Sequence, residues 1–177
     1  LPKLRAQARI RQHHIFHFIG HGGLDPSGKG KLVLLNDATR QDVLTGGEDL
    51  WRALSESRAM RLAILNACRG AESRVDDAFA GVAQQLVRGG LPAAVGMQSV
   101  ISDASATDFA TELYGALADG RSIDSAVASG RLGIRDRDPD GIEWATPVLF
   151  MRSQDGRVFN VDVLTPENRR DNRVRNL

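Results

Sequence analysis

The chain has 177 residues, of which 42% are hydrophobic and 25% charged, a composition typical of a single soluble globular domain. No segment approaches the roughly 18 apolar residues of a membrane span, and only 5% of the residues are aromatic, which leaves little for stacking on nucleic-acid bases. The formal net charge is +1, with basic residues gathered near both ends, and a single cysteine, Cys68, excludes an internal disulfide and thiolate-rich metal sites.

The first half of the chain predicts short strands around one helix. Residues 12–20 form an apolar run that ends in glycine, as a buried strand does. Residues 31–36 and 40–44 flank a short polar break and predict a hairpin. A short helix is predicted over residues 48–56, and the apolar segment 62–65 predicts the next core strand.

The second half predicts helices that alternate with strands. Apolar residues at helical spacing follow Asp76-Asp77 and stop at Gly89-Gly90, which predicts the clearest helix of the chain. The other predicted elements are, in order, a strand over 93–98, a helix capped by Ser102 or Asp103 and ending at Gly120, a helix capped by Ser122, and strands over 147–152 and 157–161. Strands joined by helical crossovers predict one α/β domain with a mainly parallel sheet and helices on both faces.

Residues suited to catalysis follow two of the predicted core strands. The first strand runs into His21-Gly22-Gly23, and the strand over 62–65 runs toward Cys68. In a parallel sheet, chemistry collects beyond the carboxyl ends of the strands, so neighbouring strands would bring His21 and Cys68 to one edge. A thiol beside an imidazole favours nucleophilic catalysis, whereas a lone cysteine elsewhere is by default a small buried hydrophobe.

Five segments that together span nearly the whole chain carry the motifs of a known family. They are HFIGHGG (17–23), LAILNAC (62–68), FAGVAQQLVRGGLPAAVGMQSVISD (79–103), FATELYGALADG (109–120) and EWATPVLFMRSQDG (143–156). The sequence Asn66-Ala67-Cys68-Arg69-Gly70 is similar to the caspase signature Gln-Ala-Cys-Arg-Gly, and His21 lies 47 residues upstream of the cysteine. The chain therefore resembles the CHAT domain, a caspase-like branch of the clan CD cysteine peptidases.

The resemblance implies a three-layer caspase-like sandwich and a cysteine endopeptidase that needs no cofactor and no metal. Cys68 would be the nucleophile and His21 the catalytic imidazole, and the N–H groups of Gly22 and Cys68 would form the oxyanion hole. Implied partners are a protein substrate and either a regulatory or repeat domain of the parent protein or a separate activator. Some members of the family act in bacterial defence. Direct binding of nucleic acid or membrane is not expected.

The same resemblance suggests how the chain is organised. We expect residues 1–162 to form the peptidase domain and residues 163–177 a polar, basic C-terminal tail. Because the sequence does not begin with Met, we also expect a regulatory part upstream of it. The lone thiol fits a reducing compartment, which predicts a cytoplasmic location.

Four residues are predicted to contact the substrate. Asn66 stands two positions before Cys68, where caspases hold a Gln that reads an acidic residue and where relatives that cut after Lys or Arg often hold an Asp. Asp103, which with Ser99 follows the third core strand, is therefore predicted as a wall of a specificity pocket that favours a basic residue. Trp144 is included because this stretch borders the substrate groove in the family.

The sequence leaves two other functions to consider. The same fold could serve as a catalytically silent interaction module in a larger signalling protein. A flavodoxin-like binding domain would need a phosphate loop, and segment 23–29, which resembles a P-loop, lacks the Ser or Thr and the helix that should follow. A metal site at His13, His14 and His17 is disfavoured, because strand alternation separates His14 from the other two and no nearby acid completes a ligand set.

Overall fold

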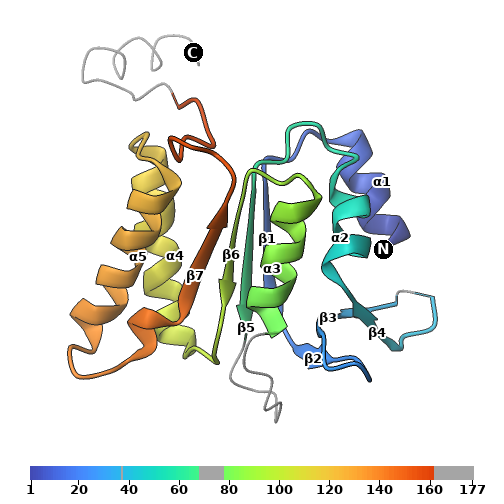
Figure 1. Ribbon diagram of the computed structural model, residues 1–177, viewed down its shortest axis with the longest axis horizontal. Coiled ribbons are helices and arrows are strands. Elements are labelled where there is room, and N and C mark those ends of the chain that lie inside the picture. Colours follow the sequence, from blue (N-terminus) through green and yellow to red (C-terminus); the bar gives the residue numbers. More distant parts are fainter. Residues whose placement is uncertain (37, 68–77, 162–177) are drawn as a thin grey trace, which may run out of the picture.

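A four-stranded sheet with strand order β1-β5-β6-β7 runs through the middle of the molecule (Figure 1). The computed structural model describes residues 1–36, 38–67 and 78–161. The first three strands of the sheet are parallel, and the last pairs antiparallel with its neighbour. The strands are β1 (Ile15–Gly20), β5 (Leu62–Ala67), β6 (Ala93–Met97) and β7 (Pro147–Met151). The predicted mainly parallel sheet is therefore confirmed.

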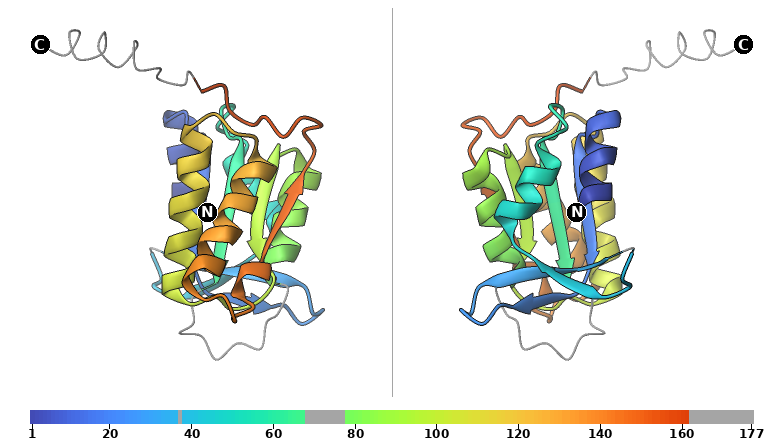
Figure 2. Two further views of the ribbon diagram at one scale, coloured as in Figure 1. Left: turned by 90° about the vertical axis from the view of Figure 1, so that its left-hand side faces the viewer. Right: turned by 90° about the vertical axis from the view of Figure 1, so that its right-hand side faces the viewer.

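Helices cover both faces of this sheet and complete a three-layer sandwich, as Figures 1 and 2 show. On one face lie α4 (Asp103–Ala118) and α5 (Ile123–Arg137). On the other lie α1 (Pro2–Ile10), α2 (Gly47–Leu54) and α3 (Ala78–Gly89). None of the helices in the described part of the chain combines the length and the hydropathy that crossing a bilayer requires.

Each central strand is buried on both faces, which explains why these strands read as continuous apolar runs. In β5, Leu62 and Ile64 belong to the core cluster beneath α4 and α5, while Ala63 and Leu65 belong to the cluster beneath α2 and α3. All four side chains are at most 1% exposed. The two periods of the sequence, two residues in strands and about 3.6 in helices, thus give two separate cores on either side of one sheet.

Helix α3 approaches the sheet closely at Gly96 of β6. A Cβ atom at this position would lie 2.6 Å from the backbone oxygen of Phe79 and 2.9 Å from the Cα atom of Ala80. Gly30, the first residue of β3 (Gly30–Leu35), meets the helix in the same way, because its Cβ would lie 2.3 Å from the Cα atom of Ala78. These two glycines allow the first turn of α3 to rest directly on the strands.

A second, antiparallel sheet with the order β2-β3-β4 lies in the crossover between β1 and β5. Its outer strands are β2 (Gly22–Leu24) and β4 (Asp42–Thr45), and β3 pairs with both. The hairpin predicted from residues 31–36 and 40–44 is confirmed as β3 and β4. The turn between β2 and β3 is organised by Asp25, whose Oδ1 accepts hydrogen bonds from the backbone N–H groups of Ser27 and Lys29.

The described structure corrects the sequence prediction at four places. Residues 157–161 do not form a strand; Val158 instead packs into the core beneath α4 and α5 at 8% exposure, so apolar character was mistaken for strand pairing. The first strand begins at Ile15, so His13 and His14 precede it and the alternation argument does not apply to them. Helix α1 and strand β2, whose sequence is Gly-Gly-Leu, were not among the predicted elements.

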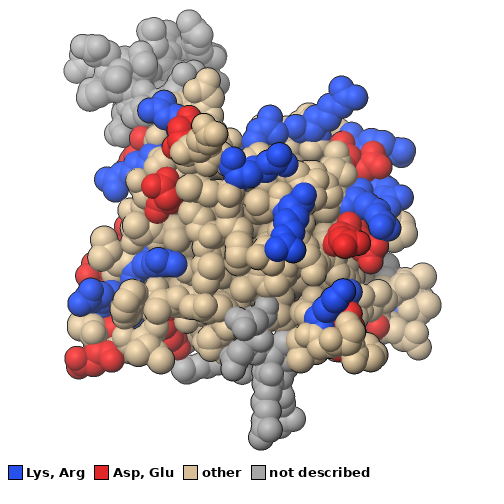
Figure 3. Space-filling model, viewed as in Figure 1, with Lys and Arg blue, Asp and Glu red and all other residues tan. Residues whose placement is uncertain are grey.

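Charged side chains are dispersed over the surface. Figure 3 shows Lys and Arg distributed over several elements of the face seen in Figure 1, with Asp and Glu among them and broad uncharged areas between them. On α1 the charge is less mixed, because Arg9 lies in the last turn and the first turn contains no acidic residue. Ala8 is the one buried residue of this helix.

Candidate active site

The carboxyl ends of β1 and β5 lie side by side in the sheet. The parallel register pairs Ile19 with Asn66 and Gly20 with Ala67, which are the last residues of the two strands. His21 leaves β1 as an exposed residue, and its carbonyl oxygen accepts a hydrogen bond of 2.9 Å from the Val33 N–H. Cys68, the residue after Ala67 in the sequence, lies outside the described residues.

Gly22 begins β2 directly after His21. Since the Val33 N–H donates to the His21 carbonyl, Gly22 and Leu32 form a non-hydrogen-bonded pair of the antiparallel ladder, so the Gly22 N–H points away from β3. Gly22 is buried, and a Cβ atom there would lie 2.6 Å from the ring of Phe79. A glycine is therefore needed here for close packing, and its backbone N–H remains outside the ladder.

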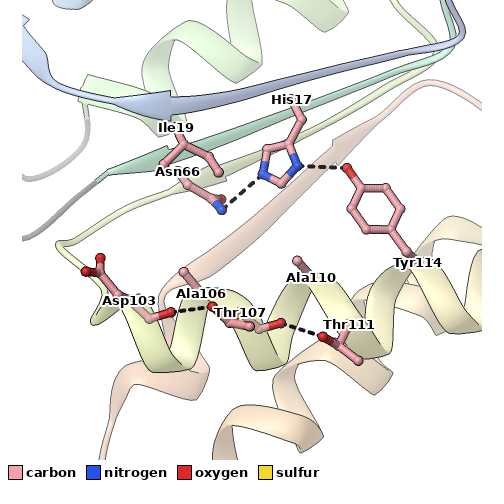
Figure 4. Close-up of a pocket in the computed structure, with 9 residues that line it drawn as sticks. All are labelled: His17, Ile19, Asn66, Asp103, Ala106, Thr107, Ala110, Thr111 and Tyr114. Carbon is pink, nitrogen blue, oxygen red and sulfur yellow. Dashed lines mark hydrogen bonds between the residues drawn. The ribbon is translucent and has the colours of Figure 1, made fainter.

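A cavity of about 450 Å³ lies beside this edge, between the β1–β5 pair and helix α4 (Figure 4). Its volume falls within the range of about 300–1,000 Å³ that is usual for ligand pockets. The lining residues are His17, Ile19, Asn66, Asp103, Ala106, Thr107, Ala110, Thr111 and Tyr114. We refer to it below as the α4 pocket.

Strand and helix periodicity explain why these residues share one cavity. His17 and Ile19 alternate on β1 toward α4, and Asn66, the register partner of Ile19, faces the same side (Figure 4). On α4, the pocket residues Ala106, Ala110 and Tyr114 are four positions apart. The neighbouring stripe of Phe109, Leu113 and Leu117 turns into the core instead. The small alanine side chains keep the helix from filling the cavity.

One wall of the α4 pocket is a hydrogen-bonded row of three side chains. Asn66 Nδ2 lies 3.2 Å from His17 Nε2, and the Tyr114 hydroxyl lies 2.9 Å from His17 Nδ1. Asn66 is only 2% exposed, and its Oδ1 has no hydrogen-bond partner among the described residues. Burial lowers the pKa of His17 and raises the pKa of Tyr114, so both side chains are neutral near pH 7.

Asp103 enters the α4 pocket from the first turn of α4. The turn is fixed by Ser102, the N-cap residue, whose Oγ accepts a hydrogen bond from the Ser105 N–H at 3.2 Å. The Ser102 hydroxyl donates in turn to Glu143 Oε2 at 2.7 Å, which ties the start of α4 to the short 3₁₀ helix η1 (Glu143–Ala145). This cap fixes the backbone of the first turn, and Asp103, an exposed residue of that turn, lines the pocket.

Of the four predicted substrate contacts, two line the α4 pocket and two do not. Asn66 lines it from β5 and Asp103 from the first turn of α4 (Figure 4). Ser99 is an exposed residue of the turn after β6. Trp144 lies in η1, 38% exposed, with the guanidinium of Arg135 5.8 Å from its ring centroid. Neither lines the pocket.

Among the pocket residues that were not predicted are the two that contact Asn66 and each other, His17 and Tyr114. From the sequence, His17 is considered only as a metal ligand, and Tyr114 lies within the helix predicted to end at Gly120. Their contact joins residues 97 positions apart, so no local pattern reveals it. Within the described ranges, no group of three or more His, Cys, Asp or Glu side chains is arranged to hold a metal ion.

A comparison with protein families adds a decisive observation. The sequence model of the CHAT domain matches residues 1–153, which include every helix and strand described above. The chain belongs to the CHAT domain family. CHAT domains are related to the caspase-like cysteine peptidases, and the mainly parallel sheet between helical layers agrees with that relationship. A comparison with curated proteins found none that matches this CHAT domain.

Proposed function

We propose that this CHAT domain is a cysteine endopeptidase in which Cys68 is the nucleophile and His21 the catalytic imidazole. The observation that carries the proposal is the parallel pairing of Gly20 with Ala67, because these residues immediately precede His21 and Cys68 in the sequence. Membership of a caspase-like family supports the same assignment. The exposure of His21 leaves its ring accessible to a bound peptide.

The proposed reaction follows the usual course of thiol peptidases. The Cys68 thiolate attacks the carbonyl carbon of the scissile peptide bond, and the carbonyl π electrons move onto the oxygen. The tetrahedral intermediate collapses, the C–N bond breaks, and His21 donates a proton to the leaving amine. Water then attacks the thioester carbonyl and gives a proton to His21. The C–S bond breaks, and the carboxylic acid product leaves with the Cys68 thiolate and the protonated His21 restored.

The oxyanion of the intermediate would be held by the N–H groups of Gly22 and Cys68. The ladder geometry of Gly22 supports this role, because its N–H is not used by the pairing of β2 with β3. An N–H donor held by a buried backbone costs little reorganisation during the reaction, and loss of one such donor typically slows catalysis by about 10²–10³-fold.

The α4 pocket is proposed as the specificity pocket. Asp103 supplies a carboxylate, Asn66 lines the pocket with a buried amide, and Ile19 and Ala106 contribute apolar surface. This combination favours the long side chain of Arg or Lys at the residue before the cleaved bond. Ser99 and Trp144 would contact the substrate outside this pocket.

Regulation and setting complete the proposal. The substrate would be a specific protein, and activity would depend on a regulatory or repeat domain of the parent protein or on a separate activator. A free thiol persists in a reducing compartment, and we therefore place the protein in the cytoplasm. A role in bacterial defence would fit such a regulated peptidase.

Cleavage of a peptide library tests the activity. Wild type should cleave fluorogenic peptides, and Cys68→Ala and His21→Ala should lose this activity, whereas His14→Ala, which removes an exposed histidine before β1, should retain it. A peptide chloromethylketone should alkylate Cys68 at neutral pH, as seen by mass spectrometry. Cleavage by Cys68→Ala, or neither cleavage nor labelling by wild type with its activator, would contradict the proposal. The second result would favour a catalytically silent interaction module.

The pocket is tested by varying the residue before the cleaved bond. We expect preference for Arg and Lys, and we expect Asp103→Asn to raise KM for these substrates more than it changes kcat. Asp119→Asn is a matched control, because Asp119 is an exposed acid at the opposite end of the same helix. Equal cleavage after basic and neutral residues would remove the assignment of Asp103.

A further inference from the structure

β1 forms one edge of the four-stranded sheet, since β5 is its one pairing partner in the described part of the chain. The hydrogen bond from the Leu62 N–H to the His14 carbonyl sets the phase of this parallel ladder. In such a ladder, alternate residues of a strand direct both their N–H and their C=O to the same neighbour. The even-numbered residues of β1 therefore bond to β5, and both groups point outward at Ile15, His17 and Ile19.

These outward backbone groups accept and donate no hydrogen bond within residues 1–36, 38–67 and 78–161. The burial of the side chains shows the same lack of a neighbour. Every residue of β6, which has a strand on both sides, is buried, whereas no residue of β1 is. Ile19 is 64% exposed although it is apolar. An unpaired edge of this kind is suited to the addition of a further strand.

Cavities lie on both faces of this edge. The α4 pocket occupies one face, and on the other a cavity of about 250 Å³ lies between β1, α1 and the end of α2. We call it the α1 cavity; Leu4, Ala8 and Met60 are among its lining residues, and His17 lines both cavities. Because side chains alternate along a strand, a strand beside β1 would direct them by turns into the α4 pocket and the α1 cavity.

The handedness of the crossovers indicates where a strand that leads into α1 would lie. The chain passes from β1 to β5 through α2 and from β5 to β6 through α3, and these helices lie on the same face of the sheet as α1. Both crossovers move the chain in one direction across the sheet. Connections between parallel strands are right-handed in about 98% of cases. A parallel strand joined to β1 through α1 would therefore lie on the side of β1 away from β5.

Helix α1 has the orientation of such a crossover helix. Figure 1 shows that it runs antiparallel to β1, on the opposite side of the sheet from α4. Leu4 and Ala8, one turn apart on α1, line the α1 cavity together with Ile15 of β1. A strand leading into α1 would end near the carboxyl end of β1 and would need a connection of only about 2–6 residues to reach the helix.

We propose that the outer edge of β1 binds an extended, apolar strand of the parent protein that leads into α1 and runs parallel to β1. Apolar side chains are required on both faces of this strand, because Ala106 and Ala110 line one cavity and Leu4, Ala8 and Met60 the other. The strand would also add a side to the α4 pocket beside Ile19, where no described element lines it away from β5. This binding site does not depend on peptidase activity.

A first experiment measures amide hydrogen exchange by NMR. In the 177-residue chain, exchange should alternate along β1, slow at Phe16 and Phe18, which bond to β5, and fast at His17 and Ile19. In the parent protein, His17 and Ile19 should exchange at least about 100-fold more slowly, because exchange then requires local opening. Fast exchange in the parent protein would overturn the proposal.

The same measurement separates other occupants of the edge. Slow exchange of His17 and Ile19 in dilute 177-residue chain would show that this chain covers its own edge. Slow exchange that appears only as the concentration of this chain rises would indicate a second copy. Slow exchange in the parent protein that requires an added protein would indicate a separate partner. Each of these results would overturn the proposal.

A second experiment blocks the edge without touching the pairing with β5. Proline lacks an N–H, and that of Ile19 points outward, so Ile19→Pro should leave Phe16 protected in the 177-residue chain. In the parent protein, Ile19→Pro should restore fast exchange at His17. Ile19→Thr, which keeps the N–H, is the matched control and should retain the protection. Equal protection of His17 in the two variants would contradict strand addition.

The sequence of the parent protein offers a third check. An apolar run of about five or six residues, the usual length of a strand, should precede α1 by a short connection. A charged or proline-rich segment at that place would contradict the proposal. None of these checks requires cleavage of a peptide. Protection of β1 in a parent protein that cleaves nothing would refute the peptidase proposal alone, and cleavage without protection would refute the strand site alone.

Discussion

Replacing Gly96 with Ala tests how closely α3 is packed against the sheet. The new methyl group would lie 2.6 Å from the Phe79 backbone oxygen, 2.8 Å from the Phe79 backbone carbon and 2.9 Å from Ala80 Cα. Since carbon atoms pack at about 3.5–4.0 Å, the start of α3 would have to move by roughly 0.6–1 Å. Gly96 has no positive φ, so the expected penalty is purely steric.

The magnitude follows from this overlap. Overpacking against backbone atoms costs about 1–3 kcal/mol, because a helix backbone cannot rotate away as a side chain can. For a domain of this size, that corresponds to a Tm lower by about 2–12 °C. Urea unfolding followed by circular dichroism should show a lower midpoint with an unchanged slope, since the fold and its buried area are retained.

A matched variant on α3 itself should have the opposite effect. At Gly81 a Cβ atom would meet nothing within 4 Å. Gly81→Ala should therefore stabilise the protein by about 0.4–1 kcal/mol, by restricting the unfolded chain and favouring helix. If Gly96→Ala were as stable as wild type, or if both variants changed Tm in the same direction, the close contact between α3 and β6 would be refuted.

Three further variants address the cap of α4, the buried imidazole and the first turn of the small sheet. Ser102→Ala removes the side-chain acceptor of the Ser105 N–H and should lower the free energy of unfolding by about 0.5–2 kcal/mol in urea titrations. Burial holds the pKa of His17 below 6.5, so as the pH drops below 6.5 the unfolded chain binds a proton that the native protein does not, and the free energy of unfolding should fall. The dependence of this free energy on pH should be shallower in His17→Gln. An unchanged dependence would contradict the assigned burial. Hydrogen bonds, first among them that from the Ser27 side chain, hold the pKa of Asp25 well below its usual value. The difference in free energy of unfolding between wild type and Asp25→Asn should be constant above about pH 5 and should shrink as the pH falls toward the native pKa. A difference that persists undiminished at pH 2 would show that the charge of Asp25 is not responsible.

The sheet and most helices could be predicted because burial constrains the sequence. Strands that are buried on both faces are continuous apolar runs, and helices that pack on the sheet have apolar residues at helical spacing. The apolar run at 62–65 and the helical spacing after residue 78 correspond to β5 and α3. Helix α1 could not be predicted in this way. It buries little more than Ala8, and with four basic residues within 1–14 the segment has no clear apolar stripe. Residues 157–161 show the reverse error, since a segment can be buried without pairing as a strand.

The site was predictable where it depends on strand order and not where it depends on contacts across the sandwich. The juxtaposition of the strand ends before His21 and Cys68 follows from sequential, parallel strands, and the register confirms the pairing of those strands. The placement of Asp103 near Asn66 needed only the direction of β6. The contact of His17 with Tyr114, by contrast, depends on how far α4 is shifted along the sheet, which no single segment encodes.

The alternation of side chains on β1 has a consequence for how this protein can change over evolution. Its odd positions, such as His17 and Ile19, face the α4 pocket, while Phe16 and Phe18 pack in the core cluster on the opposite side of the sheet. Groups separated by a sheet and without shared partners contribute nearly independently to stability. The pocket face can therefore accumulate substitutions that alter ligand preference while the opposite face continues to maintain the fold. A single strand thus carries one surface open to variation and another constrained by packing.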